Sequence, residues 1–474
     1  IEKYCSFMPV NIYLSKENAP QEYETIDEAE LRDDDVIVER IHEDAKTEEK
    51  ENDKGEKEVV EVSPAKDKVK INKRPVSLSD PEPLWMKHPN SCTDEEYKEF
   101  YRKVFMDYKE PLFWIHLNMD YPFNLKGILY FPKINMEYES IEGTIKLYNN
   151  QVFIADNIKE VIPEFLMLLK GVIDCPDLPL NVSRSALQND GFVKKISDYI
   201  TKKVADKLTG MCKTDRETYE KYWDDIAPFI KFGCLKDEKF AEKMDDYIIY
   251  KNLDGKYLTL KDCMDKAKEE GHENQIYYVT NEKEQSQYIN MFKANGQDAI
   301  IMSHSIDNPF ISQEEQKHEN LKFLRIDADV NDTLREEVKE EDKKALKKQE
   351  ETLTETFKKA LGDDKLQVKV EKLKDAEISS MITLSEETRR MQDMMKMYNM
   401  GMDASMFGGS GQVLVLNANN KLVQYVLEHT DGENTPKICE QLYDLAQLSH
   451  GSLTPERMTK FIARSNEIMG MMLN

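Results

Sequence analysis

The residue with the clearest chemical potential is Arg184, at the end of the stretch Asp177-Leu-Pro-Leu-Asn-Val-Ser-Arg184. Prolines stiffen this stretch and prevent a helix before Leu180. Asn181 and Ser183 are both good N-cap residues, so a helix is expected to begin at about Ser183. Arg184 would then project from a helix N-terminus, where the helix dipole disfavours a cation by about 0.3–1 kcal/mol.

An anion bound at this position would gain from the guanidinium of Arg184 and from free backbone N–H groups. Gln188 lies one helical turn further on, on the same face. The pattern therefore fits an arginine that senses a phosphate of a nucleotide held by another domain. It also fits an ordinary capped helix with a solvated arginine, which the pattern alone favours.

Other common chemical motifs are missing from the sequence. Neither a GxxxxGK[ST] phosphate loop nor a GxGxxG sequence after a strand occurs, and no HExxH is present. The seven cysteines are scattered without zinc-ligand spacing, so we expect reduced thiols and no metal site.

The composition restricts the partners. The net charge of -25 repels phosphate backbones and anionic lipid, so neither nucleic acid nor a membrane surface is expected as a partner. No apolar run approaches the roughly 18 residues that span a bilayer, and no signal peptide opens the chain. A cytoplasmic location is expected.

The beginning of the chain divides into two parts. Residues 1–14 are apolar and aromatic enough to be the tail of a folded domain, whose remainder we expect to precede Ile1. Residues 15–78 are dense in charges of both signs, which predicts a flexible charged linker because so little apolar surface can be buried. A solvated helix across part of it is the alternative.

Residues 79–330 are predicted to form a layered α/β middle domain of two subdomains, within an α/β (α+β) fold. The larger part, 79–210, contains helix candidates at 94–106, 158–170 and 183–209, strand candidates at 112–117 and 123–131, and a hairpin of 145–148 with 151–154 across Asn149-Asn150. A helical connector follows at 211–252. The smaller α/β part, 253–330, has strand candidates at 275–280, 299–302 and 321–326, with a helix at 283–293.

The last third differs in composition, which places a boundary near residue 330. It is predicted to contain a charged helix at 333–361, a short strand at 367–370, a methionine-rich helix and two helices that begin at Thr435-Pro436 and Thr454-Pro455. Residues 331–474 thus form a mixed, mainly helical C-terminal domain.

Long position-specific segments resemble the heat-shock protein 90 family, of the bacterial high-temperature protein G type. The resemblance covers nearly the whole chain and is densest over 83–330. Its segments are Ile145-Lys-Leu-Tyr148, Val152-Phe-Ile154, Ile162-Pro-Glu-Phe165, Lys170-Gly-Val-Ile-Asp174, Asp177 to Arg184, Pro83-Leu-Trp85, Glu95 to Tyr101, Gly127 to Pro132, Ile230-Lys-Phe-Gly233 and Asp307-Asn-Pro-Phe310.

The resemblance implies that an ATP-binding domain, with residues 1–14 as its last piece, would hold ATP and magnesium, together with the general base. Arg184 matches the family's catalytic-loop arginine, which contacts the terminal phosphate of ATP, and Asn181 and Gln188 match its polar neighbours. This chain is therefore expected to bind no cofactor and to hydrolyse no ATP by itself.

A methionine-rich segment is the first candidate surface for client proteins. Methionine is flexible and polarizable, which suits surfaces that adapt to many partners. Core packing is the alternative from spacing alone, and the resemblance favours contact with clients. The same holds for Trp85, which is otherwise expected to be a core anchor. The candidate client-binding residues are Trp85, Met391, Met394, Met395, Tyr398, Met402, Met406 and Phe407.

The two closing helices carry apolar side chains at helical spacing. Such a pair buries its apolar face against its own domain or against a partner. The resemblance implies a homodimer that forms a four-helix bundle. The candidate dimerisation residues are Leu442, Leu445, Phe461, Ile462 and Ile468.

The leading hypothesis is a chaperone module that binds unfolded or partly folded client proteins and forms a homodimer, with Arg184 assisting ATP hydrolysis by another domain. A small-molecule enzyme with its own site in the α/β domain is one alternative. A passive assembly scaffold is the other.

Overall fold

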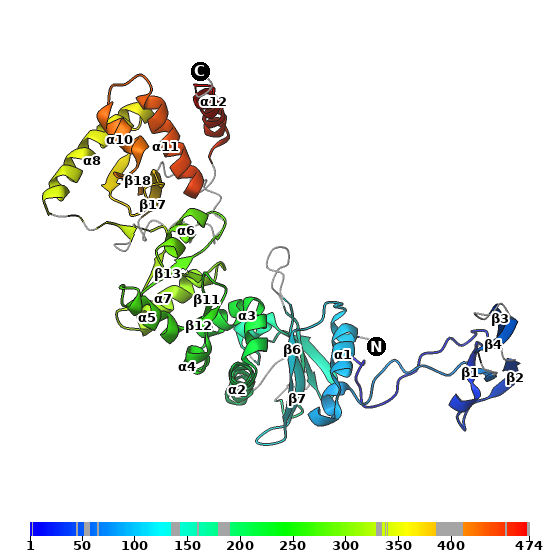
Figure 1. Cartoon of the computed structure of the whole chain (residues 1–474). Helices are drawn as coiled ribbons and strands as arrows, with labels where there is room; N and C mark the ends of the chain where they lie inside the picture. Colours follow the sequence, from blue (N-terminus) through cyan, green and yellow to red (C-terminus); the bar gives the residue numbers. More distant parts are fainter. Residues whose placement is uncertain are drawn as a thin grey trace. The chain divides into compact units, whose positions relative to one another are not determined.

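The structure is a computed structural model of the 474-residue chain. It describes residues 1, 3–43, 46–51, 57–63, 66–133, 143–158, 161–178, 190–328, 334–336, 338, 340–384, 411–450 and 453–471. The chain divides into two compact units: residues 1–163 with 167–198, and residues 164–166 with 199–474. Helices and several small sheets occur in a mixed α/β arrangement, which confirms the predicted fold class (Figure 1).

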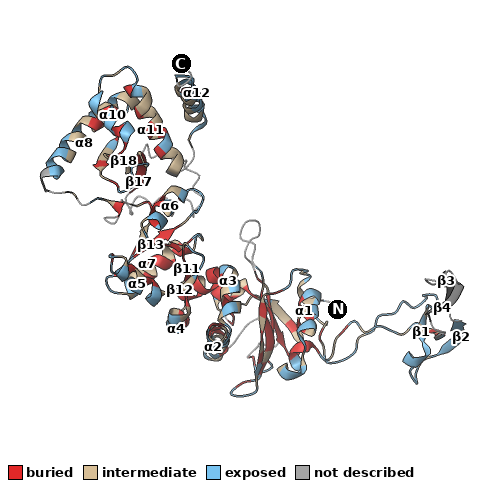
Figure 2. Cartoon of the chain, in the orientation of Figure 1, coloured by how far each residue is buried: buried red, intermediate tan, exposed pale blue. Residues whose placement is uncertain are grey.

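The first unit is built around a five-stranded mixed sheet. Its strands stand in the order β6-β7-β10-β8-β9, in which β10 runs parallel to β8 and the other neighbours are antiparallel. The residues of β7 are buried except for Lys126, as expected of a central strand (Figure 2). The strands are β6 (Phe113–Met119), β7 (Leu125–Phe131), β8 (Ile145–Asn149), β9 (Val152–Asp156) and β10 (Lys170–Asp174).

Helix α1 (Asp94–Phe105) packs its aromatic face into the same core, as the spacing predicts. It begins with a capping box in which Thr93 accepts from the backbone N–H of Glu96 and the Glu96 side chain accepts from that of Thr93. Phe100 of this helix contacts Trp85, in the short 3-10 helix η2 (Leu84–Met86). A second 3-10 helix, η3 (Pro89–Ser91), precedes α1.

The predicted β8–β9 hairpin is present, but its turn lies one residue later than expected. Asn150 and Gln151 occupy the turn with φ of 50° and 63°, the pair of positive values that a tight two-residue hairpin turn needs. Asn149 instead ends β8. Its side-chain amide donates to the carbonyl oxygens of Cys175 and Pro176, at 3.0 Å each, which holds it outside the turn.

The helix predicted over 158–170 is wrong for the described residues. A 3-10 helix, η4 (Glu164–Leu168), stands there instead, and β10 begins two residues after it ends. Pro163 would have lain inside the predicted helix, where it removes a hydrogen bond. Gly171 in β10 allows the neighbouring strand β7 to approach closely, because a Cβ at this position would lie only 2.8 Å from the Ile128 carbonyl oxygen.

The segment predicted as a flexible charged linker contains strands instead. Strands β1 (Tyr23–Asp27), β5 (Lys66–Asn72) and β2 (Ile37–Glu43) form an antiparallel sheet in that order, and β3 (Lys46–Glu51) pairs with β4 (Lys57–Ser63). Val69 and Ile71 on the central strand are buried. Charge density misled the prediction because the charges alternate with these apolar residues and pair across the chain, as Lys68 does with Glu43 at 3.0 Å.

The 3-10 helix η1 (Glu28–Glu30) connects β1 to β2, and the chain segments that flank this small sheet meet each other. The backbone N–H of Leu78 donates to the Ile12 carbonyl oxygen at 2.7 Å, and that of Ile12 donates to the Ser79 hydroxyl at 3.0 Å. Phe7, which lies in the segment predicted to end another domain, packs into the core of the first unit.

Helix α2 (Asp190–Thr214) buries Val193, Ile196, Ile200 and Val204, the face that the sequence predicts. Helices α3 (Arg216–Lys236) and α4 (Glu238–Met244) follow in the second unit, with N-caps Asp215 and Asp237. The 3-10 helix η5 (Asp245–Tyr247) ends this connector, and the hairpin β11 (Ile249–Lys251)–β12 (Tyr257–Thr259) begins within the range predicted to be helical.

The predicted smaller α/β part is a parallel three-stranded sheet with helices between its strands. Its order is β14-β13-β15, so the first strand in the chain is the central one. The elements are α5 (Leu260–Glu269), β13 (Gln275–Val279), α6 (Ser286–Ala294), β14 (Ile300–Ile301), α7 (Asp307–Lys317) and β15 (Lys322–Arg325).

The C-terminal part has its own sheet, β16-β18-β17, with helices packed on it. Its core is apolar and takes Leu353 and Phe357 from α8 and Leu414 and Leu416 from β18. The elements are α8 (Glu340–Leu361), β16 (Gln367–Glu371), β17 (Ser380–Leu384), β18 (Gln412–Asn417), α10 (Lys421–Glu428), α11 (Thr435–His450) and α12 (Pro455–Met471).

A hydrophobic cluster joins residues on both sides of the boundary predicted near residue 330. It includes Tyr277 and Phe292 before the boundary, and Leu334 and Met381 after it. The predicted domain bounds stay predictions. Among the described helices, none has the length and apolarity required to cross a membrane.

Candidate functional site: the C-terminal helix pair

Helices α11 and α12 lie antiparallel to each other, and their starts are set by local sequence. Thr454 accepts a hydrogen bond from the backbone N–H of Arg457 through its hydroxyl, and Pro455 takes the first helical position, as predicted. At the start of α11, Thr435 is buried and its hydroxyl donates to the His429 carbonyl oxygen. The short connection between the helices favours the antiparallel arrangement.

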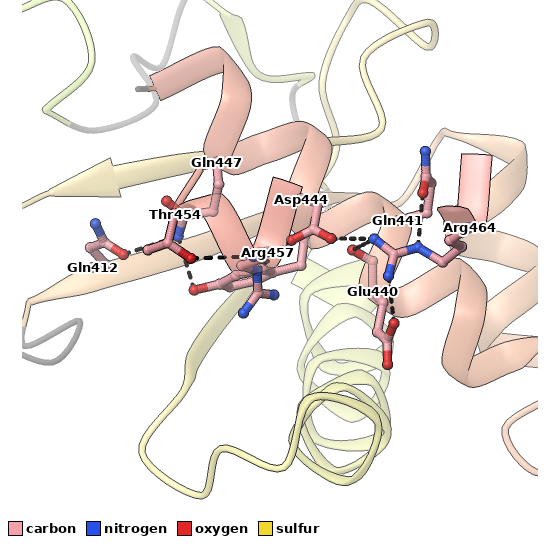
Figure 3. A network of polar contacts seen from close by, with 9 residues as sticks. Gln412, Glu440, Gln441, Asp444, Gln447, Thr454, Arg457 and Arg464 are labelled. Carbon is pink, nitrogen blue, oxygen red and sulfur yellow. Dashed lines mark hydrogen bonds and ion pairs between the residues drawn. The ribbon is translucent and has the colours of Figure 1, made fainter. Parts of the chain in front are cut away.

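A polar seam holds the two helices together (Figure 3). Asp444 on α11 is 1% exposed and forms ion pairs with Arg457 and Arg464 of α12. Arg464 also bonds Glu440 and donates to the Gln441 side-chain oxygen at 2.9 Å. A buried carboxylate between two guanidinium groups fixes the register of α12 on α11, since every alternative register leaves buried charges unpaired.

The polar seam extends in both directions along the pair. Lys437 and Glu467 form an exposed ion pair at 2.7 Å. The guanidinium of Arg457 lies over the ring of Tyr443, 4.5 Å from its centroid. Gln447 donates to the Gln412 side-chain oxygen at 3.1 Å, which connects α11 to β18 (Figure 3).

An apolar cleft of about 500 Å³ lies between α10, α11 and α12. Several of its large side chains remain exposed, among them Leu445 at 40% and Met469 at 57%. Exposed apolar side chains that gather around one cleft are typical of a surface that a partner covers. Its apolar lining residues include Leu422, Tyr425, Ile438, Leu442, Leu445, Ile468, Met469 and Met471.

The five predicted dimerisation residues differ in burial. Leu442 is almost fully buried within the core of its own domain, so its burial agrees with the alternative of packing within the chain. Leu445 and Ile462 are exposed, and Phe461 and Ile468 are partly exposed. Leu442, Leu445 and Ile468 line the cleft. Their role in dimerisation stays a prediction.

The predicted phosphate-sensing residues, Asn181, Arg184 and Gln188, lie outside the described residues. The described chain before them is hydrogen-bonded to the residue that precedes β7. Asp177 accepts from the backbone N–H of Asn124 at 2.7 Å and from its side-chain amide at 3.2 Å.

The predicted client-binding residues Met391, Met394, Met395, Tyr398, Met402, Met406 and Phe407 also lie outside the described residues. Trp85 is described, and its side chain is 0% exposed. Its ring packs against Phe7 with centroids 4.6 Å apart, and its indole N–H donates to Asp174 at 3.4 Å. Direct client contact by Trp85 does not agree with this burial; Trp85 is the core anchor that the alternative interpretation describes.

The buried titratable groups bear on the enzyme alternative. Burial raises the pKa of the Cys175, Cys234, Cys263 and Cys439 thiols to about 12, so none of the four is an activated nucleophile at neutral pH. Burial also raises the pKa of the Asp174 carboxyl, which accepts from the backbone N–H of Gln151 at 2.9 Å. All seven cysteines are free thiols.

Sequence reasoning missed the polar seam. Asp444 lies among the apolar positions of α11, and Arg464 lies among those of α12. A charged residue at the border of the apolar face of each helix was the available signal, because opposite charges beside two neighbouring apolar faces are expected to pair.

The whole chain, residues 1–474, matches the family model described as Hsp90 protein. The chain is 37% identical over 449 residues to the chaperone protein HtpG of Bacteroides thetaiotaomicron, which covers 92% of this chain and 59% of that protein. It is 39% identical over 385 residues to the chaperone protein HtpG of Porphyromonas gingivalis, which covers 78% of this chain and 55% of that protein. The chain thus spans somewhat more than half the length of these curated relatives.

Proposed function

Because the chain belongs to the Hsp90 protein family, we propose that it acts as the client-binding and dimerising part of a molecular chaperone. The observation that carries the dimer proposal is the apolar cleft between α10, α11 and α12, with exposed Leu445 and Met469 at its surface. Helices α11 and α12 of a second chain would cover this cleft and remove its apolar surface from water, and neither chain would need to refold.

A twofold arrangement suits this surface. In a symmetric dimer the same patch serves both partners, so one helix pair on each chain makes a four-helix bundle. The polar seam supports this role because it holds α12 in register on α11, and apolar side chains of both helices line the cleft beside it. Leu445 and Ile462 are the exposed predicted residues that the dimer would cover.

A charge in the cleft tests the dimer. Leu445→Asp should convert the chain to a monomer in light scattering at micromolar concentration, because burying an unpaired carboxylate costs several kcal/mol. Leu14→Asp is the matched control, since Leu14 is 77% exposed and lies outside the cleft. Unchanged mass in Leu445→Asp, with the fold intact by circular dichroism, would contradict the proposed interface.

Client binding is proposed for the methionine-rich segment that includes Met394 and Met395. The chemistry of methionine supports it, as does the family to which the chain belongs. The chain should slow the aggregation of an unfolded protein, and Met394→Gln with Met395→Gln should weaken this effect. Met106→Gln is the control because Met106 is an exposed methionine elsewhere in the chain. Equal loss in both variants would argue against a specific methionine surface, and no suppression would favour the scaffold alternative.

We also propose that Arg184, with Asn181 and Gln188, contacts the terminal phosphate of ATP that a separate domain holds together with magnesium. A preorganised arginine stabilises the charge that develops on a transferred phosphoryl group. The chain alone should therefore show no ATP turnover. Turnover by the purified chain would favour the small-molecule enzyme instead.

We likewise propose that the partners of the chain are client proteins in the cytoplasm. Nucleic acids and membranes are not proposed as partners. The net charge of -25 supports it, because such a surface repels polyanions.

A further inference from the structure

A second group of polar side chains gathers in the second unit, outside the C-terminal helix pair. Glu314 lies in α7 and His318 directly follows that helix, four residues on, so helical geometry places both on one face. Asp245 reaches them from η5. One carboxylate oxygen from Asp245, one from Glu314 and one ring nitrogen of His318 all lie within 4.8 Å of one another.

The distances between these atoms are too long for direct hydrogen bonds. The His318 Nε2 atom lies 3.9 Å from Asp245 Oδ1 and 3.8 Å from Glu314 Oε2, beyond the usual range for hydrogen bonds. This nitrogen atom is itself buried and has no hydrogen-bond partner. Two ligands bound to one tetrahedral zinc ion lie about 3.3 Å apart, so a closure of about 0.5 Å would bring the His318 nitrogen to ligand spacing from each of these two oxygens.

The surroundings of these three residues supply a buried carboxylate and an adjoining cavity through which an ion could enter. The Glu314 side chain is only 2% exposed, and its oxygen Oε1 meets the Lys317 amine at a distance of 3.5 Å. Asp245 and His318 line a cavity of about 700 Å³ beside it. Gln313 lines the same cavity, and its buried side-chain oxygen also has no hydrogen-bond partner. Two polar side-chain atoms of the residues that line this cavity therefore have no hydrogen-bond partner.

We propose that Asp245, Glu314 and His318 bind a divalent transition-metal ion of the zinc class. Imidazole nitrogen and carboxylate oxygen are both ligands of zinc, and catalytic zinc sites use three protein ligands and leave the fourth position to water. Calcium is a poor fit, because it requires six to eight oxygen ligands. A bound ion would tie η5 to the end of α7 within this unit.

Lys317 competes with the ion for the same carboxylates. Its amine lies 3.7 Å from Asp245 and 3.5 Å from Glu314. The lysine side chain is 29% exposed, so it can turn towards solvent when a metal ion enters. Removing this amine should therefore strengthen metal binding, whereas removing a ligand should weaken it.

Calorimetric titration of the full chain with zinc chloride, after chelator treatment, tests the site. We expect one ion per chain, at least a tenfold loss of affinity in His318→Ala and in Asp245→Asn, and tighter binding in Lys317→Met. Both ligand variants change partly exposed side chains, so the fold should survive, which circular dichroism checks. His88→Ala is the matched control, since His88 is exposed and lies outside the cavity.

Cobalt(II) separates this site from binding to the seven free thiols. The cobalt-loaded chain should show ligand-field bands without thiolate charge-transfer absorption, and His318→Ala should remove these bands. Zinc affinity weaker than millimolar, affinity that His318→Ala leaves unchanged, or a thiolate band that dominates the spectrum would overturn the proposal.

Discussion

Removing the Asp444 carboxylate should detach α12 from α11. This carboxylate has a side-chain exposure of 2% and pairs with Arg464, whose side chain is 7% exposed, and with Arg457, whose side chain is 38% exposed. In Asp444→Ala both guanidinium groups lose their shared partner. Arg464 keeps Glu440 and Gln441, but both lie further along α11 towards its start.

The cost follows from the burial of each pair. Breaking a buried pair by removing one partner costs about 3–5 kcal/mol. The Arg457 pair is more exposed and contributes only about 0.5 kcal/mol after solvent screening. Because Arg464 retains Glu440, we take the lower limit and expect about 3 kcal/mol in total. That corresponds to an increase of about 150-fold in the opening equilibrium of α12.

Hydrogen–deuterium exchange of peptides from 455–471 measures this opening directly. Exchange in Asp444→Ala should be faster by about two orders of magnitude, and peptides from β13 should be unchanged. Lys437→Ala is the matched control, because it removes an exposed pair between the same two helices and should change the opening free energy by less than about 1 kcal/mol. Equal acceleration in both variants would refute the role assigned to the buried carboxylate.

Three further predictions concern other buried positions. Lys231→Met should lower the free energy of unfolding by about 3–5 kcal/mol in urea denaturation, because it leaves the Asp307 carboxylate, 2% exposed, without its cation; a change below about 1 kcal/mol would contradict this. Gly171→Ala should lower the free energy of unfolding by about 1–3 kcal/mol, because the new Cβ would lie 2.7 Å from the Leu129 side chain. Gly210→Ala in α2, where a Cβ has open space around it, should instead raise the free energy of unfolding by about 0.5–1 kcal/mol. Burial raises the pKa of the Asp174 carboxyl above 3.8, so this group stabilises the folded state most at pH values below its ordinary pKa. The stabilisation is lost as the pH rises through the raised pKa. Asp174→Asn should remove this part of the pH dependence of the unfolding free energy in urea titrations, and an unchanged pH profile would argue against it.

Periodic apolar patterns predicted most of the regular elements. Helix α1 and the buried face of α2 follow from apolar residues at helical spacing. The α/β layering around the β14-β13-β15 sheet follows from strands that alternate with helices. These patterns are local, so a single sequence contains them.

The failures came from information that is not local. The strands around Val69 and Ile71 were hidden by their charged neighbours, whose partners lie in distant strands. The range 158–170 contained apolar residues that serve a strand as well as a helix, and only pairing with β7 decides between them. The aromatic partners of Trp85 likewise come from separate segments, which spacing along the chain does not reveal.

The candidate site divides in the same way. The start of α12 follows from its Thr-Pro pair, whereas α11 begins at Thr435 itself, one residue earlier than the pair predicts. The positions of the apolar residues in both helices follow from helical spacing. The polar seam depends on how the two helices pack, so the sequence alone does not show that Asp444 pairs with Arg464. Similarly, Asp245 lies about seventy residues before Glu314 and His318, and only the packing of η5 against α7 joins them.

Light scattering of the purified chain at micromolar concentration tests the central claim most directly, since the apolar cleft is proposed to be covered by a second copy. The account predicts twice the chain mass of 55.3 kDa for the unmodified protein and a single chain mass for Leu445→Asp. A mass of 55.3 kDa for the unmodified protein would contradict it.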